Sequence, residues 1–213
     1  MKILPVRFTS GVLSLEGILE VPDVPAPLPA VVICHPHPLY GGNMDNNVVT
    51  SIAEALLRAA VITFRFNFRG VGQSQGSFSQ GTGEQEDVSA AISFVAGRNE
   101  VDIKRIGLAG YSAGAAYGLP VGCRDIRVKA LAAVSPPLAM SDFDFLADCP
   151  KPLFLISGSE DDFTPAGEFN DFCQRLLPPV EHCCVEGADH FWGGRETEMA
   201  EKVANFFATE LKR

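Results

Sequence analysis

A short stretch of the sequence, Gly110-Tyr111-Ser112-Ala113-Gly114, places one serine where an apolar, strand-like run gives way to small residues that favour a helix. The Gly-x-Ser-x-Gly spacing is typical of a nucleophilic serine on a tight turn between a strand and a helix. So tight a turn strains the backbone, and the residues two positions away on each side must lack a clashing side chain. Gly110 and Gly114 meet this need. We therefore predict that Ser112 projects above the edge of a sheet, beside a helix N-terminus that favours developing negative charge.

The predicted general base is one of four histidines. A serine hydroxyl is a weak nucleophile at neutral pH, so it needs a base, and the base needs an orienting partner. His182 lies inside a predicted strand, where a structural role is expected, while His35 and His37 share an earlier loop. His190 follows the last predicted strand and precedes the last predicted helix, which brings it to the same sheet edge as Ser112. We therefore predict His190 as the base.

The orienting acid is expected in residues 158–165, directly after another predicted strand. Asp161 and Asp162 compete for this role. Both could instead cap the helix that begins near Pro165, since aspartate before proline is common at helix starts. The chain order of serine, acid and histidine, with Ser112 first and His190 last, is an order that hydrolases use, and it favours a catalytic aspartate here.

The elements that must position these side chains alternate between strand and helix. A leading hairpin is expected over residues 3–21, and a short Pro-rich connector follows it. The alternation predicts an α/β fold with a mostly parallel, doubly wound sheet and helices on both faces. The predicted later strands are 30–34, 61–66, 106–109, 128–134, 153–156 and 180–185, and the predicted helices are 46–59, 83–97, one directly after the Gly-x-Ser-x-Gly turn, 166–177 and 198–211.

The helix after the turn carries Gly118, Pro120 and Gly122. Proline lacks an N–H and clashes with the preceding turn, and glycine weakens a helix. We therefore expect this helix to end or kink early.

Composition narrows the class of protein. The 213 residues predict a single domain over 1–213, and the net charge of −9 argues against nucleic-acid binding, which depends on clustered Lys and Arg. The first residues lack the apolar core of a signal peptide, and no stretch is long enough to span a membrane, so we expect a cytoplasmic protein without membrane contact. The six scattered cysteines, with no Cys-x-x-Cys pair, predict reduced thiols and no metal site. A monomer or homodimer is expected.

Four motifs in one order carry a resemblance to a known family. They are His-Pro-His-Pro-x-x-Gly-Gly at residues 35–42, Arg-x-Asn-Phe-Arg-Gly-x-Gly-x-Ser-x-Gly at 65–76, Gly-x-x-Asp-x-x-x-Pro at 158–165 and Gly-Ala-x-His-Phe at 187–191. With Gly-x-Ser-x-Gly, they resemble the α/β-hydrolase superfamily along almost the whole chain, and more narrowly its small, capless bacterial branch. The resemblance implies an α/β-hydrolase fold of about eight strands. It also favours Asp161 over Asp162.

The resemblance further implies an oxyanion hole. Its first donor would be the N–H of Ala113, which follows the nucleophile, and its second would come from the loop at residues 35–42. The two prolines of that loop have no N–H to donate. We expect His37 to be the second donor, with Leu39 or Tyr40 as the alternatives.

The substrate pocket is expected to be open. Only a short segment lies between residues 137 and 153, where larger relatives insert a lid, so no lid domain is predicted. Aromatic residues are more often core than ligand contacts. The residues that could line an apolar pocket are Leu39, Tyr40, Tyr111, Phe163, Phe191 and Trp192.

These residues together predict a serine hydrolase that needs no cofactor. Ester is the expected bond, so the prediction is a carboxylesterase that cleaves small or short-chain acyl esters through Ser112, Asp161 and His190 and an acyl-enzyme intermediate. A small-molecule ester is the expected partner. A peptidase or thioesterase with the same triad is the alternative within this chemistry. A catalytically silent binding or interaction protein is the alternative from another class.

Overall fold

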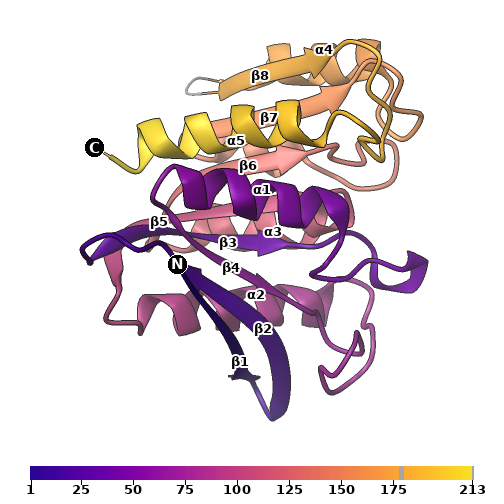
Figure 1. The fold of residues 1–213 in the computed structure, drawn as a ribbon. Helices are drawn as coiled ribbons and strands as arrows, with labels where there is room; N and C mark the ends of the chain where they lie inside the picture. The colour runs from indigo at the N-terminus through magenta and orange to yellow at the C-terminus, as the bar shows by residue number, and fades with distance from the viewer. Residues whose placement is uncertain (178–179, 213) are drawn as a thin grey trace.

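The computed structural model describes residues 1–177 and 180–212. Within them, eight strands form one sheet in the order β1-β2-β4-β3-β5-β6-β7-β8 (Figure 1). The strands are β1 (Lys2–Ser10), β2 (Leu13–Val21), β3 (Leu28–Cys34), β4 (Ile62–Phe66), β5 (Val101–Tyr111), β6 (Val128–Val134), β7 (Leu153–Gly158) and β8 (Val180–Val185). The helices are α1 (Asn47–Arg58), α2 (Thr82–Ala96), α3 (Ala113–Arg124), α4 (Ala166–Arg175) and α5 (Glu196–Glu210), with short 3-10 turns η1 (Pro38–Tyr40) and η2 (Asp144–Asp148).

The sheet is mostly parallel. The hairpin strands β1 and β2 pair antiparallel, β2 pairs antiparallel with β4, and every later neighbour pair is parallel. Since parallel strands point the same way, the loops after β3, β5, β6, β7 and β8 all emerge at one edge. The motifs predicted to carry chemistry follow β3, β5, β7 and β8, so the topology gathers them at that edge.

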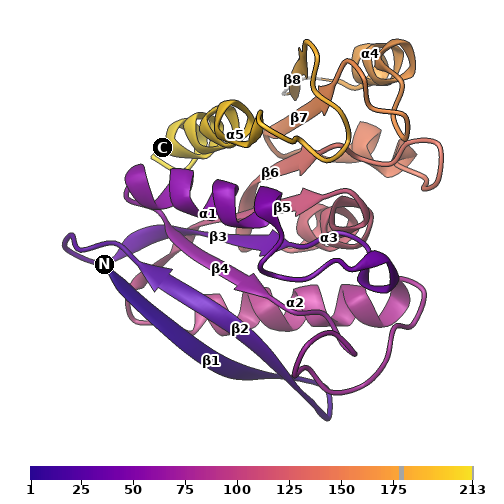
Figure 2. The same cartoon turned by 45° about the vertical axis from the view of Figure 1, so that its right-hand side comes forward.

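Helices cover both faces of the sheet. The helices α1 and α5 lie side by side on one face, and α2 and α3 lie on the other (Figures 1 and 2). On the first face, Ile52 and Leu56 of α1 and Phe207 of α5 are fully buried against the sheet. On the second face, Ile92 of α2 and Phe169 of α4 belong to the larger apolar core. The predicted doubly wound α/β architecture is confirmed.

The helix that follows Ser112 is longer than predicted. Gly118, Pro120 and Gly122 do not end α3 early, because the helix runs on to Arg124. Both glycines face the sheet, where a Cβ on Gly122 would lie 2.5 Å from a methyl group of Leu131. Close packing on the sheet thus holds the helix where its own propensity is low.

The connection between β6 and β7 contains only the short turn η2. The predicted absence of a lid domain is confirmed for this part of the chain. No helix within residues 1–177 and 180–212 is both long and apolar enough to cross a membrane.

Candidate active site

The turn between β5 and α3 is built as its glycines predict. Ser112 has φ 53° and ψ −125°, a backbone conformation that non-glycine residues rarely adopt. A Cβ on Gly110 would lie 2.5 Å from the Cα of Ala115, and a Cβ on Gly114 would lie 2.3 Å from the carbonyl oxygen of Cys34. Neither glycine can therefore be replaced without moving backbone.

Three side chains from three strand ends form one hydrogen-bonded line. The Nε2 atom of His190 lies 3.0 Å from Ser112 Oγ, and its Nδ1 atom lies 2.9 Å from each carboxylate oxygen of Asp161. An ionised carboxylate only accepts hydrogen bonds, so Nδ1 carries the proton and Nε2 is free to accept the serine proton. His190 and Asp161 are buried, whereas Asp162 is exposed. The geometry thus favours Asp161 over its neighbour.

Asp161 is held by several donors besides His190. Its Oδ1 accepts the backbone N–H groups of Phe163 at 2.9 Å and Thr164 at 3.1 Å, and its Oδ2 accepts Ser157 Oγ at 3.3 Å. Burial raises the pKa of Asp161, but hydrogen bonds and the charge of His190 outweigh burial and leave that pKa below its ordinary value. The acid therefore stays ionised.

A further hydroxyl reaches Asp161 from the end of β6. The indole Nε1–H of Trp192 donates to Ser135 Oγ at 3.1 Å. Because an indole N–H can only donate, the Ser135 hydroxyl keeps its own proton available, and its interaction with Asp161 helps to lower the pKa of that carboxyl. Ser135 and Trp192 both have positive φ, 45° and 63°. The prediction that Trp192 lines a substrate pocket is wrong, because its side chain is fully buried in the core and supports the acid.

The loop after β3 contains a backbone N–H, that of His37, without an acceptor among residues 1–177 and 180–212. Leu39 N–H donates to His37 Nδ1 at 3.2 Å, and Tyr40 N–H donates to the His37 carbonyl oxygen at 3.1 Å, so both alternative oxyanion donors are occupied. Within residues 1–177 and 180–212, the N–H groups of His37 and Ala113 have no hydrogen-bond acceptor. These two N–H groups remain the predicted oxyanion donors.

Comparison with known proteins agrees with this fold. A family model described as the alpha/beta hydrolase fold matches residues 29–175, which is more than half of the chain. The chain belongs to the α/β-hydrolase fold family. A solved α/β serine hydrolase homologue from Coxiella burnetii is 36% identical, with a TM-score of 0.87 over 96% of this chain and 97% of that one.

Two other relatives of this α/β hydrolase are informative. XC6422 from Xanthomonas campestris is described as an α/β serine hydrolase without a lid, and it is 28% identical with a TM-score of 0.86 over 97% of this chain and 94% of that chain. The uncharacterized protein RP471 of Rickettsia prowazekii is 34% identical over 85% of this chain and 79% of its own length. These similarities support a hydrolase without a lid.

His35 has a structural role in this α/β hydrolase. Its Nε2 accepts the N–H of Phe68 at 3.1 Å, so its Nδ1 carries the proton and donates to the Pro36 carbonyl oxygen at 2.7 Å. Burial is the main cause that lowers the pKa of His35 to about 4, against the hydrogen bond to Pro36. The neutral ring therefore joins the loop after β3 to the loop after β4.

The loop after β4 is held by ion pairs and glycine turns. Arg69 pairs with the fully buried carboxylate of Asp87 on α2, with N–O distances from 2.8 Å. Asn67 accepts the N–H of Met44 and donates to Glu16. Arg69 and Asn67 of the motif at residues 65–76 thus hold the loops around the site in place.

Tyr111 holds the backbone of His190 in place. Its side chain is buried, and its hydroxyl donates to the His190 carbonyl oxygen at 2.9 Å. Burial raises the pKa of Tyr111, so it remains a neutral donor. The prediction that it lines the substrate pocket is therefore wrong. No sequence signal distinguished Tyr111, Ser135 and Ser157 as partners of the site.

The other predicted pocket residues lie exposed on loops. Leu39 and Tyr40 are exposed in the loop after β3, and Phe163 and Phe191 are exposed beside His190. Their contact with substrate stays a prediction. Within residues 1–177 and 180–212, no cluster of three His, Cys, Asp or Glu side chains could hold a metal ion, and the six cysteines are free thiols.

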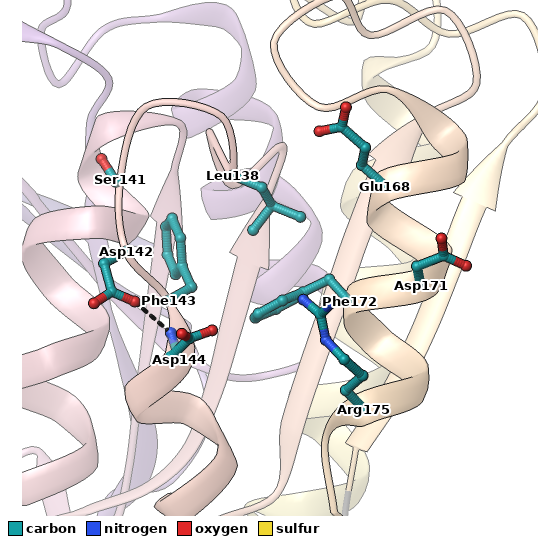
Figure 3. A pocket seen from close by; sticks show the side chains of 9 residues that line it. All are labelled: Leu138, Ser141, Asp142, Phe143, Asp144, Glu168, Asp171, Phe172 and Arg175. Atoms are coloured by element: carbon teal, nitrogen blue, oxygen red, sulfur yellow. Dashed lines mark hydrogen bonds between the residues drawn. The ribbon is translucent and has the colours of Figure 1, made fainter.

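A separate cleft of about 430 Å³ lies between the β6–β7 connection and α4 (Figure 3). Phe143 and Phe172 point into it, and acidic side chains and Arg175 surround it. Its lining includes none of the three residues of the hydrogen-bonded line, so it is not the place of the reaction.

Proposed function

We propose that this α/β hydrolase is a serine carboxylesterase that cleaves small or short-chain acyl esters. The observation that carries the proposal is the continuous line from Ser112 Oγ through His190 to the buried Asp161, with distances of 3.0 and 2.9 Å. This line has the geometry of a nucleophile, its base and the group that orients the base. The short β6–β7 connection, which holds no lid domain, supports a site open to small esters.

In the proposed first step, Ser112 Oγ attacks the ester carbonyl carbon while its proton passes to His190 Nε2. The carbonyl oxygen becomes an oxyanion and accepts the N–H groups of Ala113 and His37. Asp161 keeps its negative charge and stabilises the imidazolium. His190 then gives the proton to the leaving alkoxide oxygen as the C–O bond breaks, which leaves the acyl group on Ser112.

In the second step, His190 takes a proton from a water molecule that attacks the acyl carbonyl carbon. The same two N–H groups hold the second oxyanion. When this intermediate collapses, Ser112 Oγ leaves and regains a proton from His190, and the carboxylic acid departs. The cycle uses only the protein's own groups and water.

The test is hydrolysis of p-nitrophenyl esters from acetate to octanoate, together with covalent labelling by a fluorophosphonate. We expect Ser112→Ala to lose labelling and at least about a thousandfold in kcat. Asp161→Asn should lose about four orders of magnitude, since the amide favours the wrong histidine tautomer. The matched control is Ser141→Ala, a change in the β6–β7 connection, which should retain both activity and labelling.

The same assay separates the alternatives. If thioesters or p-nitroanilides are cleaved far better than esters, the thioesterase or peptidase alternative replaces the carboxylesterase. If the wild type neither cleaves any substrate nor takes the label, the chain is a binding protein on a hydrolase fold, and the proposal fails.

A further inference from the structure

Two aromatic rings lie in solvent beside the proposed base. Phe163, in the loop after β7, is 40% exposed, and its ring centroid lies 4.5 Å from that of His190. Phe191, after β8, is 62% exposed, with its ring 5.5 Å from His190 and nearly perpendicular to it. Large apolar side chains are usually buried in soluble proteins. Two exposed rings at a reacting group therefore offer a surface that a ligand can cover.

The two rings also contact each other. Their centroids are 6.4 Å apart and their planes meet at 89°, an edge-to-face arrangement. The third ring near His190 is different: the Tyr111 ring lies 5.7 Å from His190, but it is buried and belongs to the core. The imidazole is thus closed off by the core at Tyr111 and bordered by the exposed Phe163 and Phe191.

The direction of proton transfer decides which part of a substrate would lie there. His190 gives its proton to the leaving oxygen, so that oxygen must come within hydrogen-bond distance of Nε2. The carbonyl oxygen turns instead toward the N–H groups of Ala113 and His37. The first atoms of the leaving alcohol therefore lie beside His190, and the exposed side chains that border His190 are Phe163 and Phe191.

We propose that Phe163 and Phe191 form a subsite for the leaving alcohol of the ester, and that this alcohol carries an uncharged aromatic ring. The proposal rests on the proposed esterase function. A third ring can pack edge-to-face on this pair, which gains more than an aliphatic group of equal size. The exposed Asp162 directly precedes Phe163, and the exposed Asp189 accepts the Phe191 N–H, so two negative charges close to the rings disfavour an anionic alcohol.

The experiment compares benzyl acetate with cyclohexylmethyl acetate, two esters of primary alcohols with rings of similar size. The measured quantity is kcat/KM, which reports acylation, the step in which the alcohol leaves. We expect the wild type to prefer the benzyl ester by about two- to tenfold. In Phe163→Leu and Phe191→Leu, which keep an apolar side chain but lose the ring, this ratio should fall toward one.

Two controls locate the effect. Met140→Leu changes another exposed apolar residue, in the loop after β6, and should keep the wild-type ratio. The ratio of benzyl butyrate to benzyl acetate reports the acyl side, and it should stay unchanged in both phenylalanine variants.

Equal rates on the benzyl and cyclohexylmethyl esters in the wild type would overturn the aromatic subsite while leaving the esterase intact. A parallel loss on both esters in the phenylalanine variants would also overturn it, since the rings would then only support His190. If the wild type cleaves no ester and takes no fluorophosphonate label, the proposed function fails and the subsite fails with it.

Discussion

Replacing His37 by proline would delete one N–H from the loop after β3 and leave the backbone path compatible. His37 has φ −56° and ψ 122°, and proline fixes φ near about −65°. A proline at position 37 also requires extended backbone at the residue before it, Pro36, so the fold of the variant is measured along with its activity. We therefore expect His37→Pro to fold, and to differ from the wild type chiefly in its lost donor and its lost imidazole.

The magnitude follows from the role of that donor. Removal of one oxyanion-hole donor typically lowers kcat by about a hundred- to a thousandfold, or about 3–4 kcal/mol of transition-state stabilisation. KM should change little, because the N–H acts on charge that develops only in the transition state. The lost imidazole also removes the acceptor for Leu39 N–H and the ring contacts with Tyr40 and Phe78, which needs a control.

The control is His37→Ala, which loses the same imidazole and keeps the N–H. The ratio of kcat between the alanine and proline variants therefore isolates the N–H itself. The assay measures kcat and KM on p-nitrophenyl acetate, with circular dichroism and thermal unfolding to compare the folds. Equal kcat values for two folded variants would refute His37 as the second oxyanion donor.

Three further predictions address the frame of the site. Ser135→Gly, which tolerates the positive φ, should lower kcat/KM about tenfold, because the lost hydroxyl helps to lower the pKa of Asp161. Trp192→Phe should add little to this loss in the double variant, because its indole N–H donates to that same hydroxyl; steady-state kinetics measure both. Gly114→Ala should destabilise the fold by more than about 2 kcal/mol in urea unfolding, whereas Gly167→Ala, with free space in α4, should stabilise it by about 0.5–1 kcal/mol. Because the pKa of His35 is lowered to about 4 in the folded protein, the unfolded chain binds the extra proton first as pH falls. The free energy of unfolding should therefore decrease by about 3 kcal/mol between about pH 6.5 and about pH 4. Urea unfolding at each pH should show a smaller decrease in His35→Asn.

The parts of the site that follow from local sterics could be predicted from the sequence. A turn that leaves no room for Cβ atoms demands glycine on each side of the serine, and Gly110 and Gly114 have backbone within 2.6 Å of where a Cβ would lie. Parallel strands fix which loops share an edge, so chain order alone brought Asp161 and His190 toward Ser112. These are short-range rules that need no knowledge of packing.

The parts that depend on packing could not be predicted. The sequence does not distinguish an aromatic residue that faces solvent from one that faces the core. Phe191 and Trp192 both follow His190 closely, yet Trp192 is buried and Phe191 is exposed. The length of α3 was missed for the same reason, since the sheet surface that accepts Gly122 comes from β6. Likewise, nothing in the sequence connects Ser135 with Asp161, because their contact depends on how β6 and β7 end.

Backbone strain is concentrated at the place where these packing contacts converge. Among the described residues, five non-glycine residues have positive φ, and three of them, Ser112, Ser135 and Trp192, belong to the site. Such conformations cost of order 1–3 kcal/mol each, and they persist only where surrounding contacts hold them. Here the contacts are the hydrogen bonds from Trp192 to Ser135 and from His190 to both Asp161 and Ser112, together with the interaction of Ser135 that lowers the pKa of Asp161. The strained backbone thus lowers the stability of the fold but fixes the positions of the proposed nucleophile and acid. We therefore expect Ser135→Gly to affect turnover more than it affects substrate binding.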